Sequence, residues 1–113
     1  MKRATVIDRR SLYIPRPSDW DWDKIGEAEI QRRLGQVELA AGTLNRWWHD
    51  VYRHRAMEWE ALRGRLVEAK MGEVQERRDR IEALGKELRQ IERLKAQAQS
   101  AMDTIRKNLD FLQ

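Results

Sequence analysis

The chain has 113 residues, a net charge of +4 and no cysteine, and 37% of its residues are charged. The absence of cysteine excludes disulfides and thiolate metal sites, and no apolar run approaches the roughly 18 residues that a membrane-spanning helix needs. The N-terminus also lacks the apolar segment of a signal peptide. We therefore expect a soluble protein that carries no signal peptide.

Residues 1–17 form a basic segment that contains both prolines. The remaining residues, 18–113, carry 18 basic and 18 acidic side chains, so the whole net charge belongs to this first segment. Pro15 and Pro17 resist helix formation and favour an extended backbone before them. We predict an extended arm that docks on a protein partner through arginines and apolar side chains. The predicted contacts are Arg9, Arg10, Leu12, Tyr13, Ile14 and Arg16.

Residues 18–24, SDWDWDK, are typical of a helix start. Ser18 is a candidate N-cap, and the acidic residues that follow complement the positive end of a helix. The alternating aspartates also begin like a calcium-binding loop, but the glycine and the glutamate that such a loop needs later are absent. On a helix Trp20 and Trp22 would lie about 200° apart. We predict that one packs on the helix and the other on the arm or a partner.

One apolar stripe of helical period follows, from Ile30 to Leu66. It predicts a helix over residues 18–70 with Leu34, Trp48, Trp59 and Leu62 in the core. Trp47 and Met57 fall off the stripe, so we predict that they are exposed and contact a partner.

A heptad pattern continues to the end of the chain and predicts a coiled-coil helix over residues 73–112. Its two apolar positions are filled mainly by Leu, Ile and Met. The predicted core residues of this helix are Ile81, Leu84, Leu88, Ile91, Met102, Ile105 and Leu109.

Polar residues interrupt the pattern between these segments, and Gly72 is of a type common just past a helix end. A turn there predicts an all-α, elongated hairpin that pairs Leu34 with Leu109, Ala41 with Met102, and Trp48 with Lys95 in a cation–π contact. The alternative is one continuous helix of about 90 residues, about 130 Å long, assembled in parallel. We favour the hairpin, with residues 1–17 as the arm and residues 18–113 as the rod.

The sequence offers little for catalysis. His49 and His54 would lie about 140° apart on a helix and cannot share a metal there, and the glycines form no phosphate loop. We expect no enzyme activity, no cofactor and no metal. Residues 46–55 interleave aromatic and basic side chains, as in proteins that stack bases and bind phosphates.

The layout of an extended arm followed by a helical rod resembles small virion assembly and plug proteins of tailed bacteriophages, such as tail needles and scaffolding proteins. The resemblance implies a structural component that docks on a larger complex, in a virion or in the cytoplasm. The long apolar stripes favour a homo-oligomer. The alternative is a nucleic-acid-binding protein that uses the arm and residues 46–55, but the neutral rod favours the structural function.

Overall fold

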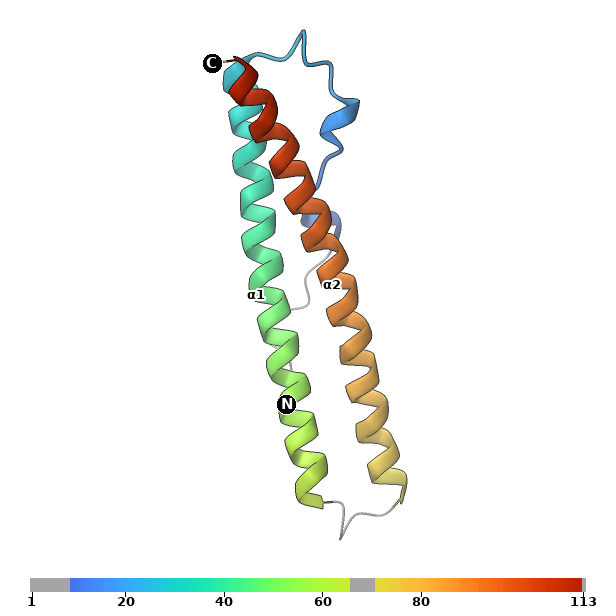
Figure 1. Cartoon of the computed structure of the whole chain (residues 1–113). Coiled ribbons are helices and arrows are strands. Elements are labelled where there is room, and N and C mark those ends of the chain that lie inside the picture. Colours follow the sequence, from blue (N-terminus) through green and yellow to red (C-terminus); the bar gives the residue numbers. More distant parts are fainter. Residues whose placement is uncertain (1–8, 66–70, 113) are drawn as a thin grey trace.

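The computed structural model describes residues 9–65 and 71–112. Two long helices, α1 (Glu27–Arg65) and α2 (Met71–Leu112), run antiparallel and form a rod with a long axis of 66 Å (Figure 1). Two short 3-10 helices, η1 (Arg9–Ser11) and η2 (Pro17–Asp19), precede them. The prediction of an all-α, elongated helical hairpin is confirmed, and the alternative of one continuous helix is wrong.

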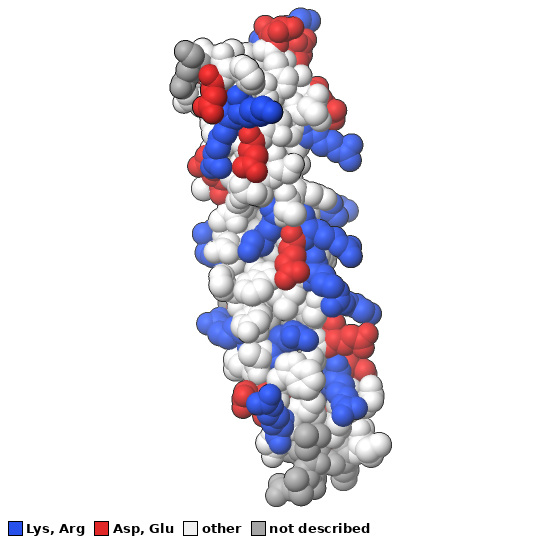
Figure 2. All heavy atoms as spheres, viewed as in Figure 1, with Lys and Arg blue, Asp and Glu red and all other residues white. Residues whose placement is uncertain are grey.

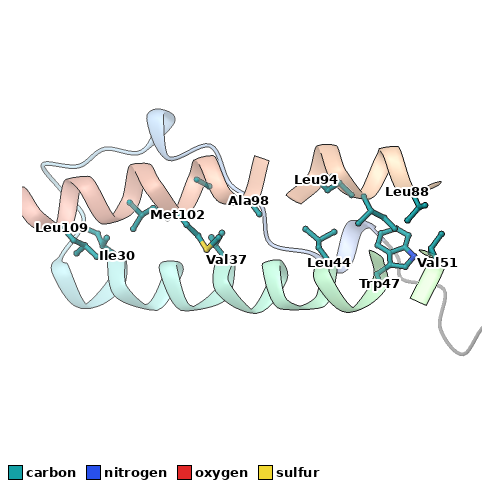
Figure 3. Packing of buried hydrophobic residues seen from close by; sticks show 13 residues of the cluster. Ile30, Val37, Leu44, Trp47, Val51, Leu88, Leu94, Ala98, Met102 and Leu109 are labelled. Carbon is teal, nitrogen blue, oxygen red and sulfur yellow. The ribbon is translucent and has the colours of Figure 1, made fainter. Parts of the chain in front are cut away.

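The core lies along the seam between the two helices. Ile30, Val37, Leu44 and Val51 of α1 follow one another at heptad spacing and have no exposed surface. They pack against the apolar side chains of α2 in one continuous cluster (Figure 3). Seven residues are close to two helical turns, so this spacing keeps one row of side chains facing the partner helix. Hydrophobic burial along this row holds the hairpin together.

The pairing of the helices differs from the predicted register by one helical turn. Leu109 lies beside Ile30 and Met102 beside Val37 (Figure 3), where Leu34 and Ala41 were predicted. Because α2 begins at Met71, Gly72 belongs to this helix and does not follow the end of the first one. The reversal falls in residues 66–70, outside the described residues.

The predicted cation–π contact survives this offset. The Nζ atom of Lys95 lies 5.4 Å from the ring centroid of Trp48. Lys95 also donates a hydrogen bond to Asn45 Oδ1 at 3.3 Å, so its long side chain spans one turn of α1. This reach explains why the contact forms in either register.

The first α-helix begins at Glu27, so the prediction of a helix start at Ser18 is wrong. Ser18 lies inside η2, and the chain then forms a turn in which the Lys24 and Ile25 amides donate to Asp21 O. An α-helix would point Trp20 and Trp22 to different sides. The irregular backbone instead brings their ring centroids to 5.3 Å and lets both pack against the core.

Residues 9–26 form a third layer against the hairpin (Figure 1). Leu12 and Tyr13 border a hollow with residues of α1, and Ile14 and Pro15 border another with residues of α2. Pro17 is buried, and its carbonyl accepts a hydrogen bond from Trp22 Nε1 at 2.9 Å. The interpretation that the arm needs a partner to cover its apolar side chains is therefore wrong.

Glu29 in the first turn of α1 should titrate at unusually low pH. Arg32 donates to it at 2.6 and 2.8 Å and Arg33 at 3.0 Å, and these bonds lower its pKa from 4.5 to about 2. A lowered folded-state pKa stabilises the fold above pH 4.5, and this stabilisation is lost as the pH falls toward 2. A ¹³C NMR titration of the carboxyl should show the low midpoint, and Arg32→Ala should raise it. A midpoint near 4.5 in the unaltered chain would contradict this arrangement.

Candidate docking site

A hollow lies between the helices in the half of the rod near residues 66–70. Arg55 and Trp59 line it from α1, and Arg78, Ile81, Glu82, Gly85 and Arg89 line it from α2. The four-residue spacing of Arg55 and Trp59 puts both on one face of α1. Trp59 is 42% exposed and separates this hollow from a second one, which is lined by Ala56, Leu62 and Arg63. We call the first one the Gly85 hollow.

The hollow exists because α2 has a glycine at its floor. Gly85 is buried, and a Cβ atom there would lie 3.5 Å from Arg55 Nε and 3.7 Å from Arg89 Nη1. Two guanidinium groups, one from each helix, thus lie over the same point of the backbone. A larger side chain at position 85 would occupy the space between them.

The arginines of the hollow differ from their neighbours in their pairing. Arg77 and Arg80 both reach Glu58 Oε2, at 3.0 and 3.9 Å. No residue of the described ranges forms an ion pair or hydrogen bond with Arg55, Arg78 or Arg89, and Arg55 Nε is buried without an acceptor. A buried donor without a partner costs about 1–3 kcal/mol. An anionic group bound in the hollow would remove this cost.

The chemistry of the hollow suits recognition. Planar guanidinium groups bind carboxylates or phosphates in a bidentate manner, and an exposed tryptophan offers a large apolar face beside them. Within residues 9–65 and 71–112, no group of three or more acidic or histidine side chains is placed to hold a metal ion. His54, whose side chain is 12% exposed, has its Nδ1 at 2.7 Å from Asp50 O. Neither α1 nor α2 contains a stretch apolar enough to cross a membrane.

The tryptophans of α1 exchange their predicted places. Trp47, predicted to be exposed, is 6% exposed and donates from Nε1 to Glu87 Oε1 at 3.3 Å. Trp59, predicted in the core, is the exposed one. The third layer explains the first error, because it covers a flank of α1 that would face solvent in a bare hairpin. Met57 is 40% exposed, as its position off the stripe predicted, and its contact with a partner stays a prediction.

The other predicted core residues lie in or against the core. Leu62, Ile81, Leu88, Ile91, Met102, Ile105 and Leu109 are buried, and Leu34, Trp48 and Leu84 are partly buried against the core cluster. Trp48 also stacks on Tyr52 with centroids 5.0 Å apart, and its Nε1 donates to Glu92 Oε1 at 3.2 Å. Both partners lie beside the seam, so this part of α1 has its aromatic contacts within the chain.

The predicted contact residues of the arm divide into two groups. Leu12, Tyr13, Ile14, Trp20 and Trp22 are partly buried against the hairpin, and Arg9, Arg10 and Arg16 are exposed. The guanidinium of Arg33 lies 4.8 Å from the ring centroid of Trp20. The apolar group thus has an internal role, while partner binding by the exposed arginines stays a prediction.

Sequence reasoning missed the Gly85 hollow. One signal was present, because Arg78, Glu82, Gly85 and Arg89 follow the spacing of one helix face and place a glycine between two arginines. The contribution of Arg55 and Trp59 depends on the pairing of the two helices, which the sequence did not specify to within one turn.

We compared the chain with protein-family models, with curated proteins and with solved structures, and found no match. The resemblance of layout to bacteriophage assembly proteins therefore stays a prediction.

Proposed function

We infer that the protein is a non-enzymatic structural component that assembles by docking an acidic protein segment, with an apolar side chain beside its carboxylates, in the Gly85 hollow. The observation that carries this proposal is the group of three arginines without described partners around a half-exposed tryptophan. Trp and Arg are the residue types most enriched among the residues that dominate binding energy at protein interfaces. A carboxylate would pair with the arginines while its apolar neighbour covers Trp59.

The distribution of charge favours a protein partner over nucleic acid. Along α2 basic and acidic side chains alternate, and Glu82 itself lines the hollow. Figure 2 shows basic side chains over much of the rod with acidic ones among them, rather than one continuous basic stripe. A nucleic-acid backbone needs such a stripe, because its affinity comes mainly from many phosphate contacts. An isolated basic hollow fits a short acidic segment better.

Peptide binding tests this function. The chain, kept dilute and labelled with a fluorophore, is titrated in low-salt buffer with a synthetic peptide of alternating Glu and Leu. We expect saturable binding, which Trp59→Ala and Arg89→Ala should each weaken about tenfold, corresponding to about 1.4 kcal/mol. A Lys–Leu peptide of equal length is the matched ligand control and should not bind at the hollow.

Two results would overturn the proposal. The first is no saturable binding of the acidic peptide, or binding that both substitutions leave unchanged. The second is tighter binding of a single-stranded oligonucleotide that the same substitutions abolish, which would assign the hollow to nucleic acid. A steep loss of oligonucleotide affinity with salt would identify phosphate contacts.

A further inference from the structure

The C-terminal end of α2 has the chemistry that the Gly85 hollow lacks. Asp110 is exposed, and no residue of the described part of the chain pairs with it. The next residue, Phe111, is 81% exposed. A carboxylate beside a large apolar side chain is the type of segment that an arginine cluster around a tryptophan would bind.

Asp110 and Arg89 belong to the same row of α2. They are three heptads apart, with Ala96 and Asp103 at the two positions between them. In a helix that follows the heptad repeat, these four residues keep the same position relative to the seam. All four are exposed, and the small side chain of Ala96 allows a second helix to approach closely.

A two-fold axis crossing this row makes the charges complementary. If α2 of a second copy lies antiparallel on the row with its Asp110 opposite Arg89, symmetry places Arg89 of the second copy opposite Asp110 of the first. The same register sets Lys107 against Glu92. Parallel pairing would instead set Arg89 against Arg89 and Asp110 against Asp110. The row therefore favours the antiparallel arrangement.

The positions along the rod also agree. Trp59 is six residues from the end of α1, which is about 9 Å along the helix. Phe111 is in the last turn of α2, at the opposite end of the rod. Two rods that overlap along their full length thus bring each Phe111 to the partner's Gly85 hollow. A face of a rod 66 Å long and about 20 Å wide is large enough for the roughly 800 Å² per partner of a stable interface.

We propose that the protein forms an antiparallel, two-fold symmetric dimer in which Asp110 and Phe111 of each copy occupy the Gly85 hollow of the other. This inference rests on the proposed function and names the acidic segment as the end of α2 of a second copy. Two identical contacts close the assembly, so it stops at two chains.

Sedimentation equilibrium in low-salt buffer tests the dimer with two complementary variants. The hollow variant carries Trp59→Ala and Arg89→Ala, and the end variant carries Asp110→Asn and Phe111→Ala. Each variant alone loses both contacts, so we expect its dimer dissociation constant to rise at least a hundredfold over that of the unaltered chain. A mixture of the two retains one contact and should form a mixed dimer at least tenfold tighter than either variant alone.

A charge exchange tests the central pair without removing apolar groups. Arg89→Glu and Asp110→Lys should each weaken the dimer at least tenfold, and the chain that carries both should recover it, because each contact then has its charges reversed. The matched control is Leu39→Ala with Arg46→Ala, an exposed apolar and an exposed basic residue of α1 outside the row. This control should dimerise as the unaltered chain does, and circular dichroism should show equal helicity in every variant.

Three results would overturn the dimer: an unaltered chain that stays monomeric at all concentrations, mass that grows beyond two chains, or a doubly exchanged chain that dimerises no better than the single ones. The peptide titration separates this failure from that of the proposed function. If the chain is monomeric but the acidic peptide binds in the hollow, the docking function stands with another partner. If both fail, both proposals fall.

Discussion

Replacing Ile91 by aspartate is expected to unfold the hairpin. Ile91 has no exposed surface and lies in the central cluster between the helices. An ionised carboxylate placed there without a partner costs several kcal/mol after relaxation, in addition to the lost hydrophobic burial. The total stability of a domain is about 5–15 kcal/mol. Far-UV circular dichroism of Ile91→Asp at neutral pH should therefore show a large loss of helical signal.

The adjacent residue provides the matched control. Gln90 is exposed on the same turn of α2, so Gln90→Asp introduces the same side chain into water. We expect it to keep the helical signal and to change stability by less than about 0.5 kcal/mol, apart from a small propensity effect. If Ile91→Asp kept a cooperative thermal transition close to that of Gln90→Asp, position 91 would not lie in the core.

The heptad pattern of α2 was the most informative part of the sequence. Its apolar positions carry Ile81, Leu88, Ile91, Ile105 and Leu109, and all five are buried. The hairpin was also predictable, because two apolar stripes of similar length need each other to be covered. Both features depend on patterns within single helices, and a short-range pattern is what a sequence shows directly.

Features that depend on how the layers meet were not predictable. Trp47 is buried because residues 9–26 cover its flank of α1, and the sequence gave no sign that a segment with two prolines would pack there. The Gly85 hollow likewise needs Arg55 and Gly85 to meet across the seam. A shift of one helical turn in the register would bring a different residue to Gly85, so the site could not be assembled from the sequence.

Trp22→Ala is expected to destabilise the isolated chain by about 2–3 kcal/mol. Complete burial makes a Trp→Ala change cost about 3–5 kcal/mol, and Trp22 is only partly buried. The substitution removes the hydrogen bond from Nε1 to Pro17 O, the contact with the Trp20 ring and the packing against the core. Urea unfolding followed by circular dichroism should show a lower midpoint with a similar slope.

The result distinguishes a structural third layer from an arm that only awaits a partner. Asp19→Ala is the control, since Asp19 is exposed in η2 on the same segment and should change stability by less than about 0.5 kcal/mol. A docking arm held only by a partner would leave the isolated chain equally stable with or without the Trp22 ring. Equal unfolding midpoints for Trp22→Ala, Asp19→Ala and the unaltered chain would thus remove residues 9–26 from the folded core and restore the sequence-based interpretation of the arm.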